Sequence, residues 1–286
     1  MHSVRKLARI DFNIPGVKVV GMELITLLNA PEPNMVEIAR TAELDPAVLG
    51  SILACANSPL YGGITEVVDL RVALPRLGLK EIRRIIFHVV LESAFRSDNA
   101  EANTVLRELW RLSLTVALIM QRLIPDCPQV RSLPVDRLAM VYPLGLMHSI
   151  GIPVLLINFF DIFAKVLREG VDPSQPQMFH REKGLFDGFD HCVLGSELVS
   201  RWGFPDFFCD VIGAYHQANP DLNAHSRVLH SLLRYARYLA ADLVAADDTH
   251  QDYWLQGNML DTSSVDPVSV MADVIDQISN IPLMLK

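Results

Sequence analysis

Three histidines are the residues of this chain whose type and setting could support chemistry. His148 lies in GLMHSIG, His191 in FDHCVLG and His216 in AYHQ, each within or beside an apolar segment with helical spacing. An imidazole titrates near neutral pH, so it can transfer a proton, and its neutral form binds divalent metal ions. The structural alternative is a buried, hydrogen-bonded ring for His148, a turn-stabilising ring at a helix start for His191, and a charged ring near a helix C-terminus for His216.

Familiar catalytic signatures are absent from the sequence. It contains no GxGxxG, no GxxxxGK[ST], no GxSxG and no HExxH motif. The four cysteines, at positions 55, 127, 192 and 209, form no CxxC pair. We therefore expect reduced cysteines in a cytoplasmic protein, without a zinc ribbon or a thioredoxin-type site.

The composition favours a large hydrophobic core and limits the kinds of partner. Of 286 residues, 50% are hydrophobic and 20% charged, which argues against disorder. Asp plus Glu number 33 and Lys plus Arg 25, a net charge of -8. An acidic surface repels the phosphate backbone of nucleic acids, so we expect no nucleic-acid partner.

One uncharged stretch, residues 138–160, is long enough to cross a membrane. It contains Pro143, Pro153 and Gly151, with His148 and Ser149 near its centre. Prolines and polar side chains favour two short buried helices joined by a turn near Gly151 over a single span. We therefore expect no membrane association.

Helical spacing dominates the rest of the chain. Asp45-Pro46 has the pattern of an N-cap followed by the first helical residue. Apolar residues three and four apart follow between residues 82 and 90, marking one buried face. Further helices are predicted at 106–124, 190–201, 206–216, 224–245 and 265–278, and no run of strands with period-two alternation is found. The predicted fold is all-α.

The rise in polarity at Ser97-Asp98-Asn99 divides the chain into two helical subdomains. We expect an N-terminal extension (1–19), an N-terminal helical subdomain (20–97) and a second helical subdomain (98–246) packed closely against it. The remaining residues, 247–286, are expected to form a polar tail with a terminal helix.

The order and spacing of several motifs resemble one known family over roughly residues 20 to 245. The N-terminal motifs are Asp45-Pro46, Ala56-Asn57-Ser58 and Leu77-Gly78-Leu79; the C-terminal ones are His148-Ser149-Ile150-Gly151, Phe189-Asp190-His191, Arg201 to Pro205, and Tyr215-His216. This pattern resembles the HDOD domain family, a bacterial signalling relative of the HD metal-dependent phosphohydrolases. The resemblance implies a multi-helix bundle whose C-terminal part is HD-like.

The resemblance also implies that the hydrolase metal site is degenerate. HD hydrolases hold divalent ions with a His, a His-Asp pair and a later Asp, and hard cations prefer such carboxylate oxygens. The corresponding positions here are Leu112, His148-Ser149 and Arg237, so one ligand of four remains. We expect no catalytic residue, no metal and no cofactor. His148, Ser149, His191, His216 and Arg237 would line a vestigial pocket that favours anions.

A second candidate site is independent of the family. Arg76, Lys80, Arg83 and Arg84 have spacings that place them on one face of a helix, although Pro75 and Gly78 weaken that helix. The functional interpretation is a docking face for an acidic or phosphate-bearing partner. The alternative is an ordinary solvated face.

Three functions are compatible with these observations. The first is a non-enzymatic output or scaffold module that binds bacterial receiver, cyclase or kinase proteins in the cytoplasm. The second is a sensor for a nucleotide or small anion in the vestigial pocket, and the third is a divergent phosphohydrolase. The sequence favours the first, acting alone, in trans or as a piece of a longer regulator, and leaves the oligomeric state open.

Overall fold

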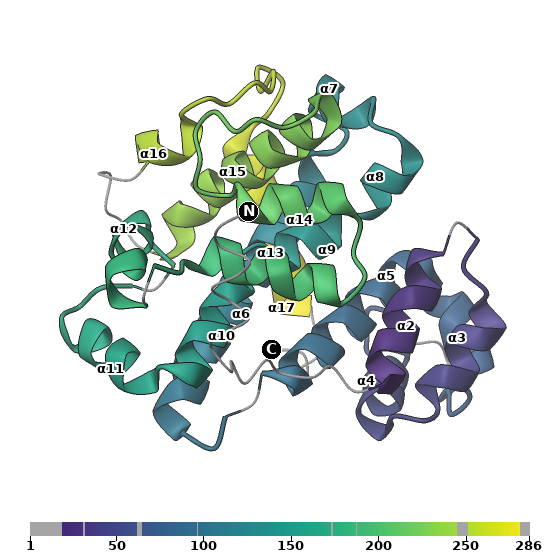
Figure 1. Ribbon diagram of the computed structural model, residues 1–286. Coiled ribbons are helices and arrows are strands. Elements are labelled where there is room, and N and C mark those ends of the chain that lie inside the picture. Colours follow the sequence, from purple (N-terminus) through teal and green to yellow (C-terminus); the bar gives the residue numbers. More distant parts are fainter. Residues whose placement is uncertain are drawn as a thin grey trace.

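The computed structural model describes residues 19–30, 32–61, 65–95, 97–172, 174–186, 188–244 and 251–280. Throughout these ranges the regular elements are helices, and no strand occurs in them (Figure 1). The predicted all-α fold is therefore confirmed. All of the predicted N-terminal extension except Val19 lies outside the described residues.

The N-terminal helices form one end of the molecule. They are α2 (Val19–Asn29), α3 (Met35–Ala42), α4 (Pro46–Ala56) and α5 (Leu70–Ala94). In Figure 1 the first three lie together, with α5 extending from them toward the rest of the chain. This group corresponds to the predicted N-terminal helical subdomain.

Capping side chains start these helices where the sequence predicts. The Asp45 carboxylate accepts hydrogen bonds from the backbone N–H of Ala47 (2.9 Å) and Val48 (3.4 Å), and Pro46 is the first residue of α4. Beyond α4, the Asn57 side chain both donates to and accepts from the backbone of Val67, each at 2.8 Å. These bonds close the loop between α4 and α5.

Helix α5 is two helical segments joined at a kink. Gly78 has φ +75° and ψ 158°, a conformation that a residue with a Cβ rarely adopts. After this kink, the predicted apolar face is buried: Ile82, Ile85 and Ile86 are fully inaccessible to solvent. The buried face holds α5 against its neighbours.

The remaining helices build the larger, C-terminal part. They are α6 (Ala100–Leu123), α7 (Pro128–Arg131), α8 (Val135–Ala139), α9 (Val141–Met147), α10 (Gly151–Asn158), α11 (Phe160–Arg168), α12 (Pro176–Leu185), α13 (His191–Arg201), α14 (Asp206–Gly213), α15 (Ala224–Val244), α16 (Gln251–Leu255) and α17 (Pro267–Asn280). Long α6 lies against α9, α15 and α17.

One hydrophobic core runs through both parts. Phe95, just after α5, has its ring 5.8 Å from that of Trp110 on α6 and 6.4 Å from that of Trp202 after α13. Phe87 on α5 lies 6.4 Å from Phe204. Aromatic pairs at these distances favour association, so the two helical parts pack closely, as predicted.

The uncharged stretch consists of two helices, α9 and α10, as its prolines and glycines predicted. Within the described ranges, Val141–Asn158 is the one stretch whose length and composition would suit a membrane span, and 89% of it is buried inside the protein. A Cβ on Gly145 would lie 2.5 Å from the Ala117 Cα, so α9 packs directly on the backbone of α6.

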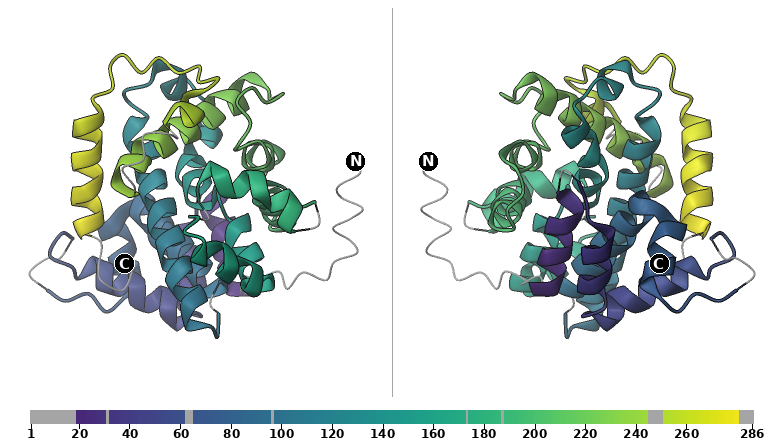
Figure 2. Two further views of the ribbon diagram at one scale, coloured as in Figure 1. Left: turned by 90° about the vertical axis from the view of Figure 1, so that its left-hand side faces the viewer. Right: turned by 90° about the vertical axis from the view of Figure 1, so that its right-hand side faces the viewer.

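The C-terminal region differs from the predicted polar tail. Helix α17 was predicted and packs on α6 through buried Val270 and Val274, with an ion pair of 2.6 Å between Arg122 and Asp273 (Figure 2). The short helix α16 was not predicted, and its Trp254 is completely buried. Two aromatic residues within a polar stretch dock this segment: Trp254 is buried, and the Tyr253 hydroxyl lies 2.8 Å from Nδ1 of His216.

Candidate functional site

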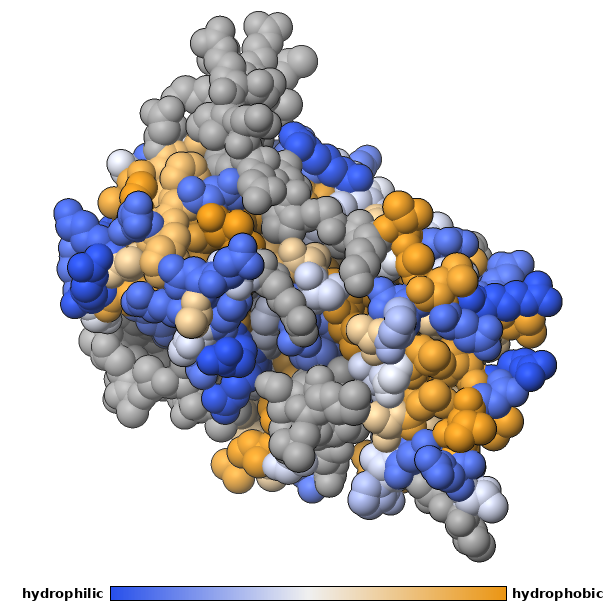
Figure 3. Space-filling view, turned by 90° about the horizontal axis from the view of Figure 1, so that it is seen from below, coloured by the Kyte–Doolittle hydropathy of each residue, from blue (hydrophilic) through white to orange (hydrophobic). Residues whose placement is uncertain are grey.

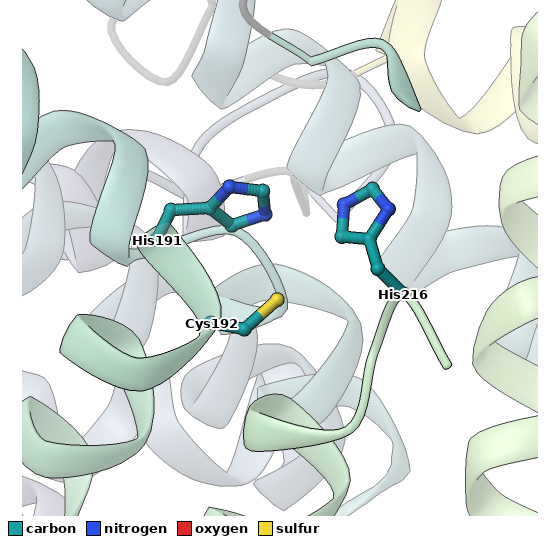
Figure 4. A group of neighbouring side chains, drawn as sticks. All are labelled: His191, Cys192 and His216. Carbon is teal, nitrogen blue, oxygen red and sulfur yellow. The ribbon is translucent and has the colours of Figure 1, made fainter. Parts of the chain in front are cut away.

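Two of the predicted site histidines face each other in the C-terminal part. His191 begins α13 and His216 follows α14, with their ring centroids 5.0 Å apart. Figure 4 shows the two rings turned toward one another, with the Cys192 sulfur pointing into the same region. The potential ligand atoms of the three residues all lie within 4.8 Å of one another.

His191 is fixed by a buried carboxylate that the sequence analysis did not identify. The Asp190 side chain caps α13 by accepting from the Val193 N–H at 2.9 Å. Glu182 of α12, with no exposed surface, accepts from the His191 backbone N–H at 2.7 Å and from its ring Nδ1 at 2.8 Å. Both the start of the helix and the orientation of the ring therefore depend on Glu182.

The surroundings of the His191 ring favour its charged form. Burial alone would lower its pKa, but the adjacent negative charge of Glu182 raises the pKa of His191 well above its ordinary value. An imidazolium is a donor at both nitrogens. Nδ1 donates to Glu182, and Nε2 is a buried donor without a hydrogen-bond partner among the described residues.

His216 is neutral, in contrast to the charged ring expected near a helix C-terminus. Burial, followed by the charges of His191, Arg234 and Arg237, lowers the pKa of His216 well below its ordinary value. Its Nδ1 lies 2.8 Å from the Tyr253 hydroxyl, and Phe179 stacks on its ring at 4.1 Å. Helices α12 and α16 thus hold His216 from two sides.

His148 is a buried structural histidine. Its Nδ1–H donates to the Gly145 carbonyl at 2.7 Å, and its ring meets the Tyr215 ring edge-on at 4.9 Å. Burial lowers the pKa of His148 to about 3. The structural alternative considered for this residue is confirmed.

We expect the buried His148 to contribute to acid denaturation. In the folded state its pKa is below the ordinary value of the unfolded chain, so this contribution is complete above pH 6.5 and is lost as the pH falls toward 3. If unfolding binds one more proton, the free energy of unfolding falls by about 1.4 kcal/mol for each pH unit, or about 2 kcal/mol between pH 6 and 4.5. Urea unfolding across this range should show a shallower pH dependence for His148→Gln; equal slopes would contradict it.

Ser149, at the position of the missing Asp, pairs with another hydroxyl. Its Oγ lies 3.4 Å from Oγ of Ser113 on α6, and both residues are buried. Ser113, rather than the aligned Leu112, is therefore the α6 residue that reaches Ser149. Neither residue supplies an imidazole or a carboxylate at this position.

Arg237 is entirely buried on α15. Its Nη2 donates to the Ser174 carbonyl (3.3 Å) and hydroxyl (3.4 Å), and its guanidinium carbon lies 5.1 Å from the centre of the Trp254 ring. Within the part of the chain that the structure describes, Nε and Nη1 of Arg237 have no hydrogen-bond partner.

A second buried arginine, Arg234, lies one helical turn earlier and was missed by the sequence analysis. It donates to the carbonyl of Tyr215 at 3.1 Å and also to that of Tyr253, which ties α16 to the segment after α14. Arg234 and Arg237 are three residues apart, a spacing that makes them neighbours on one face of a helix. This spacing was the signal in the sequence that could have identified Arg234.

The structure brings the three predicted histidines together around Tyr215, whereas Ser149 pairs with Ser113 instead. The ring centroids of His148, His191 and His216 lie 4.9, 6.4 and 4.6 Å from that of Tyr215. The Trp254 ring stacks on Tyr215 with a centroid distance of 5.1 Å. Arg237 joins this group through Trp254.

Comparison with known proteins identifies the family. The profile of the HDOD domain matches residues 14–218. The chain belongs to the HDOD domain family. A curated relative, an uncharacterized protein of Treponema pallidum (strain Nichols), is 22% identical over 213 residues, which are 73% of this chain and 38% of that protein. The chain thus spans well under half of that relative's length.

Solved structures share the fold of this HDOD protein. An HDOD domain protein of unknown function from Geobacter sulfurreducens superimposes with a TM-score of 0.65 at 20% identity, covering 98% of this chain and 94% of that one. A protein of Shewanella amazonensis SB2B, provisionally named a phosphohydrolase, superimposes with a TM-score of 0.68 at 21% identity, covering 99% of this chain and 95% of that one. A protein of Marinobacter aquaeolei VT8, provisionally named a signal transduction protein, superimposes with a TM-score of 0.71 at 19% identity, covering 96% of this chain and 59% of that one.

The residues of this HDOD domain do not fit the divalent ion of an HD hydrolase. The positions that the family resemblance assigns to its carboxylates hold the Ser149 hydroxyl and the buried Arg237 guanidinium, whose charge repels cations. His191, Cys192 and His216 could supply nitrogen and sulfur ligands, but burial raises the pKa of Cys192 and so disfavours its thiolate. The carboxylate that touches this group, Glu182, is already paired with His191, whereas hard cations need free oxygen donors.

The predicted basic docking face does not form. The Arg83 guanidinium donates to the carbonyls of Ala139 (3.2 Å) and Leu28 (2.6 Å), and Arg84 pairs with Glu81. Arg76 donates to a carbonyl of α4 at 3.3 Å, which leaves Lys80 as the exposed member. The kink at Gly78 puts these residues on two helical segments, so their spacing does not define one face.

Proposed function

We propose that this HDOD protein is a non-enzymatic signalling module that acts through contacts with other proteins. The observation that carries this proposal is the donor set of the HD-like site, where a serine pair and a buried arginine replace the carboxylates. Without them no water can be activated by a bound hard cation. The helical fold that the protein shares with hydrolases would then provide a surface to which partner proteins bind.

Exposed apolar side chains support a docking surface on the N-terminal helices. Five of the large hydrophobic residues between positions 36 and 72 are more than half exposed: Val36, Leu44, Leu60, Val68 and Val72. Figure 3 shows apolar residues gathered on the side of the molecule where Figure 1 places α2 to α4. Exposed apolar residues that gather on one part of a surface are typical of protein–protein interfaces.

The proposed partners are bacterial receiver, cyclase or kinase proteins in the cytoplasm. The provisional name of the Marinobacter relative points to signalling, and the net charge of -8 disfavours nucleic acid. All four cysteines are buried and free, which suits a reducing compartment.

Capture of partners by the intact chain from its source lysate tests this proposal. Leu44→Ser combined with Val68→Ser should reduce recovery of a receiver, cyclase or kinase about tenfold or more, because each lost apolar contact at an interface costs about 1 kcal/mol or more. The matched control is Val135→Ser combined with Val268→Ser, equally exposed residues outside the N-terminal helices. Equal losses in both variants would contradict the docking surface. An empty capture together with metal-stimulated phosphatase activity would overturn the proposed function.

A further inference from the structure

Unpartnered buried polar atoms concentrate around Tyr215. Among the described residues, eleven buried side-chain nitrogen or oxygen atoms lack a hydrogen-bond partner, and six of them lie here. They are Nε2 of His191, the Tyr215 hydroxyl, Nε of Arg234, Nε and Nη1 of Arg237, and Nε1 of Trp254. Such atoms are costly to bury, so a cluster of them requires an explanation.

All six atoms can donate a hydrogen bond. The two guanidinium groups and the Trp254 indole are donors only, and the charged His191 ring donates from both nitrogens. The Tyr215 hydroxyl donates or accepts. Together these groups, most of which can only donate, match an acceptor-rich ligand better than a cation.

The six atoms belong to one connected group. Trp254 stacks on Tyr215 at 5.1 Å, and the guanidinium carbons of Arg234 and Arg237 lie 5.5 and 5.1 Å from the centre of the Trp254 ring. The His191 ring lies 6.4 Å from that of Tyr215.

The group also carries excess positive charge. Arg234 and Arg237 are 2% and 0% exposed, and neither forms an ion pair with a carboxylate among the described residues. Glu182, the buried carboxylate nearby, already pairs with His191. Two buried guanidinium charges without a counterion are expensive, and an anion would neutralise them.

We propose that His191, Tyr215, Arg237 and Trp254 form a buried binding site for a phosphate group. Phosphate offers tetrahedrally arranged acceptor oxygens and suits the forked guanidinium. The group can come from inorganic phosphate or from a nucleoside monophosphate. Because Trp254 of α16 is itself part of the site and is fully buried, binding would couple the site to the C-terminal region.

Thermal unfolding with each phosphate source at constant ionic strength tests the site. Inorganic phosphate and AMP are added separately to the wild-type chain, and ³¹P line broadening measures binding directly. At about 100 times its Kd the bound source should raise Tm by roughly 4 °C. A response to inorganic phosphate identifies the free ion as the source; a response to AMP alone identifies the ester.

Arg237→Gln should lose the Tm shift and weaken binding about tenfold or more, since a charged bidentate donor is removed. It should not lower the Tm of the ligand-free protein, because it also removes an uncompensated buried charge. Arg227→Gln, on the exposed face of the same helix, should keep the full response. Arg237→Lys keeps the positive charge but not the planar donor arrangement of the guanidinium. It should bind phosphate more weakly than wild type, and it provides a test even if the glutamine variant fails to fold.

Three results would overturn the proposal. One is the absence of any response to either phosphate source. Another is a response that Arg237→Gln and Arg237→Lys both retain in full. The third is stabilisation by Mn²⁺ or Zn²⁺ alone, which would assign the group to a cation. None of these outcomes depends on whether the chain docks to a signalling partner.

Discussion

Replacing Gly151 by alanine is expected to lower the free energy of unfolding by about 3 kcal/mol or more. A Cβ at this position would lie 1.9 Å from the carbonyl oxygen of His191 and 2.9 Å from the backbone nitrogen of Gly195. Both atoms are backbone of α13, so no side chain can rotate away. Helices α10 and α13 would have to separate, and the His191 end of the site would move with them.

Gly50 provides the matched control for this prediction. It lies inside α4, where a Cβ would meet nothing within 4 Å. Gly50→Ala should therefore stabilise the protein by about 0.5 to 1 kcal/mol through helix propensity. Urea unfolding of both variants measures the difference. If Gly151→Ala were as stable as wild type, the direct contact between α10 and α13 would be refuted.

The second large effect is expected for Glu182→Ala, at about 3 kcal/mol of lost stability. The substitution leaves the charged His191 ring without its buried counterion and the His191 backbone N–H without its acceptor. Glu169→Ala, which breaks an exposed pair with Arg181, should leave Tm unchanged within error. Similar Tm values for both variants would mean that Glu182 does not hold His191.

The pH dependence of Glu182→Gln separates charge from packing. The pKa of His191 in the folded protein is raised above its unfolded value, so its stabilising contribution is complete below pH 6.5 and is lost as the pH rises through the folded pKa. The glutamine variant keeps the size of the side chain but not its charge. NMR titration should then show the His191 pKa below its ordinary value, since burial remains; an unchanged pKa would contradict the pairing.

The close contact at Gly151 gives a structural reason for a motif that has lost its carboxylate. In His148-Ser149-Ile150-Gly151, the glycine lets α10 touch α13, and the histidine closes the end of α9 through the Gly145 carbonyl. Both roles are independent of a metal ion. A packing requirement can therefore preserve the outline of a hydrolase motif even where its aspartate is replaced by a serine.

Local signals in the sequence predicted most of the helices. Asp45-Pro46 and Asp190 begin α4 and α13 because capping depends on adjacent residues, and the Ile82 to Val90 spacing defines a buried face of α5. The gathering of His148 with His191 and His216 could be anticipated from the family resemblance alone, because α9 lies far from α13 and α14 in the sequence.

What the sequence could not provide were contacts between distant segments. Glu182 lies in a polar helix and gives no sign of being buried under His191. Trp254 was assigned to a polar tail because its partners, Tyr215 after α14 and Arg237 on α15, lie in other parts of the chain. The basic face failed for the same reason: Arg83 bonds to carbonyls more than 50 residues away in either direction.

Calorimetric titration with Mn²⁺, combined with a phosphodiesterase assay in the same buffer, tests the loss of metal chemistry most directly. The donor set of Ser149, Ser113 and Arg237 predicts no stoichiometric binding of the ion and no metal-stimulated hydrolysis. Tight binding of one or two Mn²⁺ per chain, with hydrolysis that disappears in His191→Gln, would contradict it.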